Sequence, residues 1–92
     1  MQTMSIEGEF DFRSAAATRR SLLRGLRDVD GLEVDMAGVT RIDSAGLASL
    51  VEALQAARRH GKRFAVTGLG TQARRMLALA RLDAVFAVET RH

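Results

Sequence analysis

The chain has 92 residues, of which 47% are hydrophobic and 27% charged, a size and composition that fit one small folded domain and exclude a disordered chain. It has no Cys, which excludes disulfide bonds and thiolate metal sites. The N-terminus lacks the apolar segment of a signal peptide, and no stretch approaches ~18 apolar residues. We therefore expect a single cytoplasmic domain over residues 1–92 with no membrane insertion.

The positive charge of the chain is carried almost entirely by Arg. The formal net charge is +3, and thirteen of the fourteen basic residues are Arg, scattered along the chain. The only aromatic residues are four Phe, so partners for base stacking are missing. We expect no direct binding of nucleic acid.

The first half of the chain alternates between the two-residue period of a strand and the 3.6-residue period of a helix. Met4–Glu7 alternates apolar with polar residues, as a half-buried strand does, and Gly8–Asp11 is expected to end it. Residues 14–27 have helical spacing. Leu32–Met36 predicts a second strand, and Ala37–Arg41 a loop after it.

The second half begins with the clearest helix, residues 44–59. Its apolar stripe has the spacing i, i+3, i+4, i+7 and is expected in the core: Leu47, Leu50, Val51 and Leu54. Gly61 follows where a left-handed residue would end the helix. Arg63–Thr67 predicts a strand, residues 71–82 a helix and Val85–Val88 a short last strand.

This order, βαβαβαβ, predicts the α/β class. We expect a small, mixed β-sheet of about four strands with helices packed against it.

The start of the helix at 44–59, within the segment R-I-D-S-A-G-L (41–47), has an unusual composition. Asp43 can occupy the N-cap, with Ile42 and Leu47 spaced as a hydrophobic staple. Ser44 then falls at the first helical position and points outward. Gly46 is a poor helix former, which makes sense if another backbone or a partner must come close.

Three roles are open for Ser44. A helix cap formed by Asp43 or Ser44 is the simplest interpretation. A nucleophile is disfavoured, because D-S-A-G is not G-x-S-x-G and neither His60 nor His92 is placed to act as a base. The third role is phosphorylation: an exposed hydroxyl beside unpaired N–H groups and the positive end of the helix dipole would tolerate a phosphate.

Metal and cofactor sites are not indicated. The two His residues are far apart in sequence, and Asp11, Asp35 and Asp43 could form a carboxylate cluster but are more simply solvated strand ends. We expect no enzyme activity, no metal and no cofactor.

Four segments resemble the STAS domain, and most closely its bacterial anti-sigma factor antagonists: G-E-F-D-F (8–12), L-E-V-D-M-A-G-V-T-R-I-D-S-A-G-L (32–47), G-K-R-F-A-V-T-G (61–68) and A-R-R-M-L-A-L-A-R-L-D-A-V-F-A-V (73–88). The resemblance runs from about Ile6 to Val88. Its specific part is the pentad D-S-x-G-L; the remainder is general α/β patterning.

The resemblance implies a STAS-like fold and a role for each residue of the pentad. Ser44 would be phosphorylated by a partner anti-sigma factor, an ATP-binding serine kinase, and Asp11 would be an acidic residue near that site. Together with Asp11 and Ser44, the remaining pentad residues would form the partner-binding surface: Asp43, Ala45, Gly46 and Leu47. The unphosphorylated chain would bind the kinase and release a sigma factor for transcription, and a serine phosphatase would reverse the modification.

Two departures from the family pattern stand out. The family usually has a further strand before G-E-x-D, so we expect a barer sheet edge here. Ala45 replaces a common Ser, as in a sister group, the cytoplasmic STAS subunits of phospholipid-trafficking ABC transporters, which bind an ATPase subunit. That group is the alternative.

Overall fold

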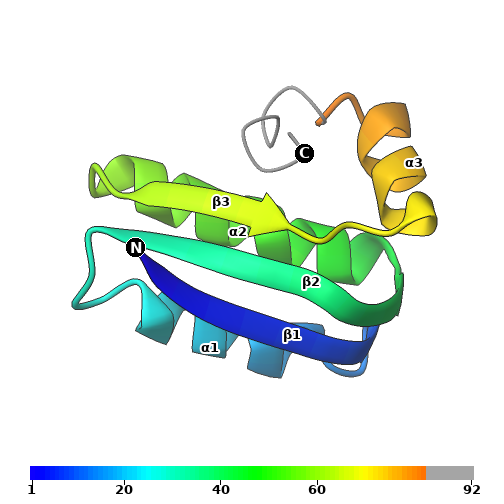
Figure 1. Ribbon diagram of the computed structural model, residues 1–92, viewed down its shortest axis with the longest axis horizontal. Coiled ribbons are helices and arrows are strands. Elements are labelled where there is room, and N and C mark those ends of the chain that lie inside the picture. The colour runs from blue at the N-terminus through cyan, green and yellow to red at the C-terminus, as the bar shows by residue number, and fades with distance from the viewer. Residues whose placement is uncertain (83–92) are drawn as a thin grey trace.

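The structure, a computed structural model, describes residues 1–82 of the chain (Figure 1). Strands and helices alternate within them: β1 Gln2–Phe10, α1 Ala15–Gly25, β2 Gly31–Ile42, α2 Ser44–Arg59, β3 Arg63–Thr67 and α3 Thr71–Leu79. The predicted order is therefore confirmed up to α3. The strand predicted at Val85–Val88 lies outside the described residues.

The sheet of the described part has the order β1-β2-β3, and both pairs of neighbouring strands are parallel. The predicted α/β class is confirmed, whereas the sheet expected to be mixed, with about four strands, has three parallel strands in residues 1–82. The reason is that each strand is followed by a helix that returns the chain to the same end of the sheet. Figure 1 shows α1 and α2 together behind one face of the sheet.

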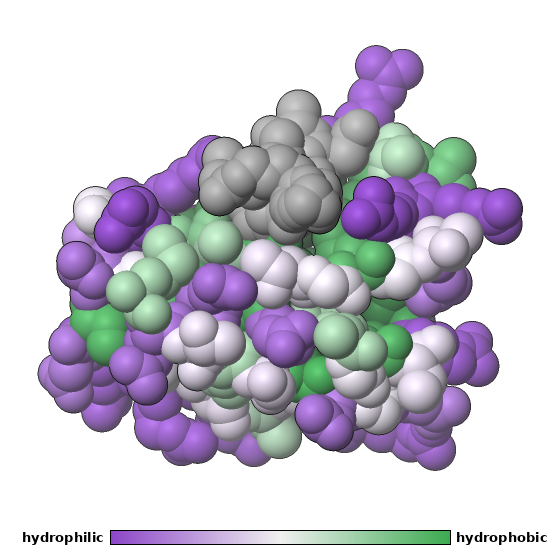
Figure 2. Space-filling view, viewed as in Figure 1, coloured by the Kyte–Doolittle hydropathy of each residue, from purple (hydrophilic) through white to green (hydrophobic). Residues whose placement is uncertain are grey.

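The opposite face of the sheet is largely polar. The residues that alternate with the buried ones along β1 and β2 are exposed or half-buried: Thr3, Ser5, Glu33 and Asp35. The coloured part of this face in Figure 2 shows purple and white residues, with smaller green, hydrophobic areas between them. The hydrophobic core thus lies between the sheet and the pair α1 and α2.

The strands β1 and β2 are longer than the sequence pattern predicts. The segment Ala37–Arg41, predicted as a loop, belongs to β2, and β1 continues through Gly8, where it was expected to end. The two strands stay paired as far as Phe10 and Ile42, with two irregularities in register. Gly8 has a φ of +77° at the second irregularity, a conformation that glycine adopts without strain. Pairing between strands therefore outweighs the local turn composition.

The predicted core stripe of α2 is only half correct. Leu50 and Leu54 are buried, whereas Leu47 and Val51 are partly buried at the edge of the core. Smaller residues face inward instead, among them Ser49 and Ala53, because α1 packs closely against this side of α2. The Ser49 hydroxyl lies 3.2 Å from the carbonyl oxygen of Ala15, to which it donates.

No helix within residues 1–82 combines the length and the apolar character needed to cross a membrane.

Candidate functional site

The candidate site lies where β1 and β2 end. Phe10 and Ile42, the last residues of the two strands, are paired in the sheet. Because the strands are parallel, the turn that follows β1 and the residue that precedes α2 lie side by side. The sequence segments 8–12 and 41–47 therefore meet in one place.

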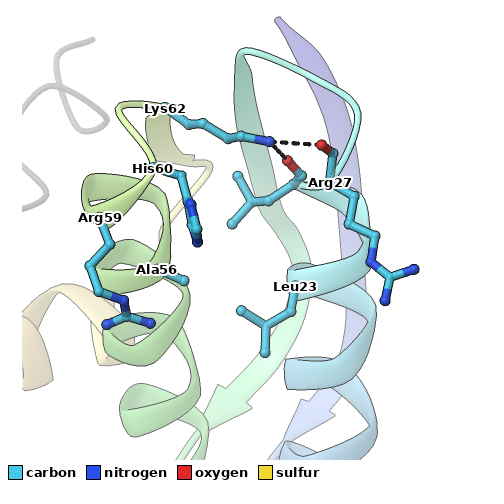
Figure 3. Close-up of a pocket in the computed structure, with 7 residues that line it drawn as sticks. Leu23, Arg27, Ala56, Arg59, His60 and Lys62 are labelled. Atoms are coloured by element: carbon cyan, nitrogen blue, oxygen red, sulfur yellow. Dashed lines mark hydrogen bonds between the residues drawn. The ribbon is translucent and has the colours of Figure 1, made fainter.

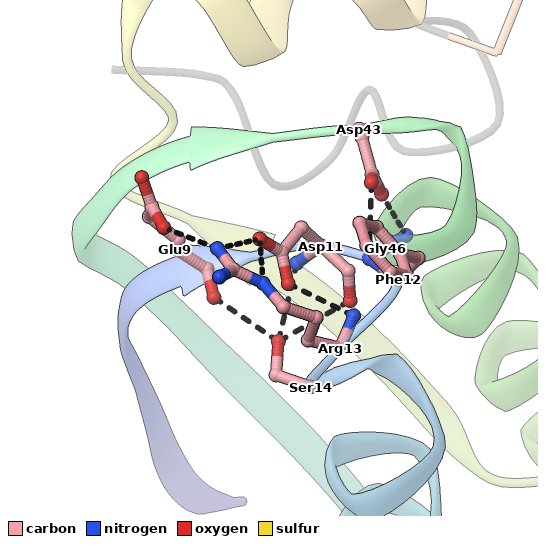
Figure 4. A network of polar contacts seen from close by, with 7 residues as sticks. All are labelled: Glu9, Asp11, Phe12, Arg13, Ser14, Asp43 and Gly46. Atoms are coloured by element: carbon pink, nitrogen blue, oxygen red, sulfur yellow. Dashed lines mark hydrogen bonds and ion pairs between the residues drawn. The ribbon is translucent and has the colours of Figure 1, made fainter.

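Asp43 joins these two segments through both oxygens of its side chain. Its Oδ1 accepts a hydrogen bond of 3.0 Å from the backbone N–H of Gly46, which confirms Asp43 as the N-cap of α2. Its Oδ2 accepts one of 3.0 Å from the backbone N–H of Phe12 in the turn (Figure 4). A single carboxylate thus fixes the start of α2 and the turn after β1.

Gly46 allows the two segments to approach so closely. A Cβ atom at this position would overlap the carbonyl oxygen of Phe10 and lie 2.9 Å from the Ile42 side chain. Of the two reasons considered for a glycine here, the close approach of another backbone is confirmed. Gly46 is buried and lies against Phe10 of β1.

Asp11 is held in the same turn by Arg13. The Arg13 guanidinium donates to Asp11 at 2.8 Å and to Glu9 at 2.9 Å, and the Arg13 backbone N–H donates to Asp11 at 3.0 Å (Figure 4). The hydrogen bonds from the Arg13 side chain hold the pKa of Asp11 below its ordinary value of 3.8. The carboxylate is therefore an ionised, oriented part of the turn.

The alternative of a carboxylate cluster fails for one of its three members. Asp11 and Asp43 lie at the same edge of the sheet, but Asp35 lies within β2 and accepts from the backbone N–H of Ala37 at 2.9 Å. Across residues 1–82 no group of three or more His, Cys, Asp or Glu could hold a metal ion.

Ser44 is exposed at the first position of α2. Within the described part of the chain its hydroxyl has no hydrogen-bond partner, because Asp43 supplies the cap. His60, the C-cap of α2, lies at the other end of the helix from Ser44, and His92 is outside the described residues. The Ser44 hydroxyl is therefore accessible to another molecule, and His60 is too far away to act as its base.

An apolar groove of about 680 Å³ opens beside Ser44, between α2 and α3. Its lining combines apolar side chains with Arg75: Ser44, Leu47, Thr71, Gln72, Arg75, Met76, Leu79 and Ala80. Gln72 fixes α3 here, because its side chain bonds to both the N–H and the carbonyl of Ile42, at 3.0 and 2.8 Å. Leu79, one of the lining residues, is 87% exposed.

Phe12 is a site residue that the sequence pattern did not identify. Its side chain is 72% exposed, and the Arg13 guanidinium lies 5.9 Å from its ring centre. Strand alternation would place Phe10 and Phe12 on one face, but the chain turns after Phe10, which is fully buried. The signal that could have revealed Phe12 is its position directly after the turn-forming Asp11.

Comparisons with known proteins place this geometry in a family. A family model described as "Mlab, STAS domain" matches residues 1–89. A putative anti-sigma factor antagonist from Thermotoga maritima is 21% identical, with a TM-score of 0.83 over 90% of this chain and 73% of that one. An anti-sigma factor antagonist from Mycobacterium paratuberculosis is 27% identical, with a TM-score of 0.74 over 91% and 72%.

A transporter-related protein has the same fold. A sulfate transporter family protein from Wolinella succinogenes is 18% identical, with a TM-score of 0.81 over 97% of this chain and 74% of that one. These likenesses establish a common fold, and the family model covers nearly the whole chain. The protein belongs to the STAS domain family.

Proposed function

We propose that the chain is an anti-sigma factor antagonist that works by partner switching. In its unphosphorylated form it binds an ATP-binding anti-sigma factor kinase in the cytoplasm, which frees a sigma factor. Phosphorylation of Ser44 ends that binding, and a serine phosphatase restores it. The observation that supports this proposal is that Asp43 holds both sides of the helix start and leaves Ser44 exposed.

This arrangement separates the switch from the fold. The cap of α2 is provided by Asp43, so a change at Ser44 removes no hydrogen bond within residues 1–82. A phosphate at the first helical position would add roughly −1.5 to −2 charges beside the positive end of the helix dipole. We therefore expect the phosphorylated protein to keep its fold while its surface changes.

The surroundings of Ser44 suit a protein partner. Exposed Phe12 is bonded through its N–H to Asp43 at the helix start, and the apolar groove lined by Leu79 also reaches Ser44. A partner that covers these side chains would bury a phosphate on Ser44 against its own surface. An uncompensated charge in an interface costs about 2–5 kcal/mol, which corresponds to roughly 30- to 4,000-fold in affinity.

In this proposal the chain is a binding module and its partner is the enzyme. Phosphoryl transfer requires bound ATP and a base, both of which the kinase would supply. The exposed hydroxyl of Ser44 and the carboxylates of Asp11 and Asp43 would then act in recognition.

The proposal is tested by incubating the purified chain with its cognate kinase and ATP and mapping the phosphate by mass spectrometry. We expect one phosphate per chain, on Ser44, and none on Ser44→Ala. Ser49, five residues later but buried, is an internal control that should stay unmodified. Phosphate on another residue, or none, would refute the role of Ser44.

A second candidate is a STAS subunit of a phospholipid-trafficking ABC transporter, which would use the same surface to bind an ATPase subunit. It is favoured by Ala45 in place of the common Ser, and by similarity of fold to a sulfate transporter family protein. Affinity purification of the tagged chain distinguishes the two candidates: the first predicts a soluble kinase among the bound proteins, the second a transporter ATPase.

A further inference from the structure

A depression of about 390 Å³ lies between the C-terminal ends of α1 and α2, at the other end of α2 from Ser44. Its lining has an apolar part and a basic part: Leu23, Leu26 and Ala56, and Arg27, Arg59, His60 and Lys62. The volume is within the range of roughly 300–1,000 Å³ that is usual for small-molecule sites.

The apolar residues form the floor of the depression. Figure 3 shows Leu23 and Ala56 facing each other across the gap between the two helices. Leu26 and Ala56 are nearly buried, whereas Leu23 is half-buried and accessible from the depression. The floor can therefore cover a short apolar group.

The basic residues form the rim. Lys62 spans the top of the gap, and its Nζ donates to the carbonyl oxygens of Leu26 and Arg27, the second at 2.9 Å (Figure 3). His60 points between the helices, while Arg27 and Arg59 extend along the two outer sides. Lys62 thus ties the end of α1, and the Arg27 and Arg59 side chains would turn inward to reach a ligand in the gap.

The charge of this rim is not balanced by carboxylates of the described chain. The seven lining residues include no Asp or Glu, and neither Arg27 nor Arg59 forms an ion pair within residues 1–82. The partial negative charge at two helix C-termini, equivalent to about half a charge each, offsets only part of it. Positive charges around a concave, partly apolar surface attract an anion to that surface.

We propose that this depression binds an anionic amphiphile, in which a compact phosphate or carboxylate group is held by the basic rim and a short apolar chain lies on the floor. The apolar floor alone would not bind the charged group, and the basic rim alone would not bind the apolar chain. Since α2 has 16 residues and rises about 1.5 Å per residue, the depression lies roughly 24 Å along the helix from Ser44. The site is therefore spatially separate from Ser44.

The experiment is a titration of the ¹⁵N-labelled chain, followed by NMR, with three probes: octyl phosphate below its micelle concentration, inorganic phosphate and octyl glucoside. We expect octyl phosphate to bind at least ~10-fold more tightly than either probe that carries only one half of the chemistry. The shifted amides should cluster in residues 23–27 and 56–62. Equal affinity for octyl phosphate and octyl glucoside, or shifts centred on the groove between α2 and α3, would overturn the proposal.

Matched variants test the rim. Arg27→Gln/Arg59→Gln removes two lining charges, and Arg20→Gln/Arg58→Gln removes two charges of α1 and α2 that lie outside the lining and are exposed. The first variant should lose at least ~10-fold in affinity for octyl phosphate, and the second less than ~2-fold. Equal losses would show a general effect of net charge and would also overturn the proposal.

The source of the anionic group is distinguished with vesicles. Co-sedimentation with phosphatidylglycerol vesicles but not with phosphatidylcholine vesicles, lost in the Arg27→Gln/Arg59→Gln variant, would assign the ligand to a lipid in a bilayer. Binding of octyl phosphate without co-sedimentation would assign it to a dispersed ligand. Both results support the site, since both require the same rim and floor.

Discussion

The start of α2 and its end differ in how their charged side chains are partnered. At the start, Asp43 accepts hydrogen bonds from two backbone N–H groups, and Asp11 is paired with Arg13. At the end, Arg27 and Arg59 have no carboxylate partner within residues 1–82. The start uses its charges to hold backbone segments in place. At the end only Lys62 does so, and Arg27 and Arg59 lie around a depression.

This difference separates two uses of charge in a small domain. Charges that are hydrogen-bonded to the backbone position the groups between them, here the Ser44 hydroxyl and the Phe12 ring. Charges without partners establish a local potential that attracts an oppositely charged ligand. Substitutions of the bonded carboxylates Asp43 and Asp11 should therefore change stability and geometry, whereas substitutions of Arg27 and Arg59 should change binding alone.

The largest effect is expected from Leu50→Ala, which should lower the stability of the whole domain and so affect both ends of α2. Leu50 is 1% exposed and lies midway along α2. Its truncation should cost about 2–5 kcal/mol in the free energy of unfolding, measured by chemical denaturation. A loss below ~1 kcal/mol would show that the middle of α2 is not anchored in the core.

The next largest effect is expected from Gly46→Ala, which acts on the start of α2 only. An Ala in place of a helical Gly normally gains about 1 kcal/mol, but here the new methyl group would overlap the Phe10 carbonyl. We expect a net destabilisation of about 1–3 kcal/mol.

Gly25→Ala is the matched control for this substitution, because the nearest side-chain atoms to the added Cβ lie at 3.6 Å, an ordinary contact. It should be neutral or stabilising in the same denaturation experiment. Similar results for both glycines would mean that β1 and α2 are not packed as closely as described.

A smaller effect is expected from Asp43→Ala, which removes the link between α2 and the turn. The loss of an N-cap costs about 0.5–2 kcal/mol, and the Phe12 N–H loses its partner as well. The melting temperature should fall, and Phe12 amide exchange should accelerate. Asp28→Ala, at an exposed position outside α1 and β2, is the control and should change neither measurement.

The smallest effect is expected from the pH dependence of the Asp11–Arg13 pair. The folded-state pKa of Asp11 is lowered, so its contribution to stability is present above 3.8 and is lost as the pH falls through the lowered value. The difference in melting temperature between wild type and Asp11→Asn should be small at neutral pH and disappear in acid. A difference in melting temperature that grows as the pH falls would contradict a lowered pKa of Asp11.

The sequence predicted the start of α2 better than its surroundings. Asp43 as cap, Ser44 as the exposed first residue and Gly46 as a point of close approach all follow from local rules, because a helix start is decided by a few neighbouring residues. Ala37–Arg41 was mispredicted because its strand conformation depends on pairing with β1, some 30 residues earlier.

The remaining features could not be predicted because they arise from tertiary structure. Phe12 is exposed since the chain turns after Phe10, and Gln72 reaches Ile42 across 30 residues of sequence. The basic depression combines the ends of two helices, neither of which has a motif of its own. Local sequence patterns predict helices, strands and caps, but they do not predict which of these elements contact one another in the folded chain.

The central claim is that Ser44 is a switch that is separate from the fold. Its most direct test is calorimetric measurement of the affinity of the anti-sigma kinase for wild type, Ser44→Ala and Ser44→Asp, with the melting temperature of each recorded alongside. We predict that Ser44→Ala binds with the affinity of wild type and that Ser44→Asp binds at least roughly 30-fold more weakly. The free energy of unfolding should change by less than about 1 kcal/mol in both variants. Equal affinity for all three proteins, with a clear loss of stability in Ser44→Ala, would contradict the claim and make Ser44 a structural cap.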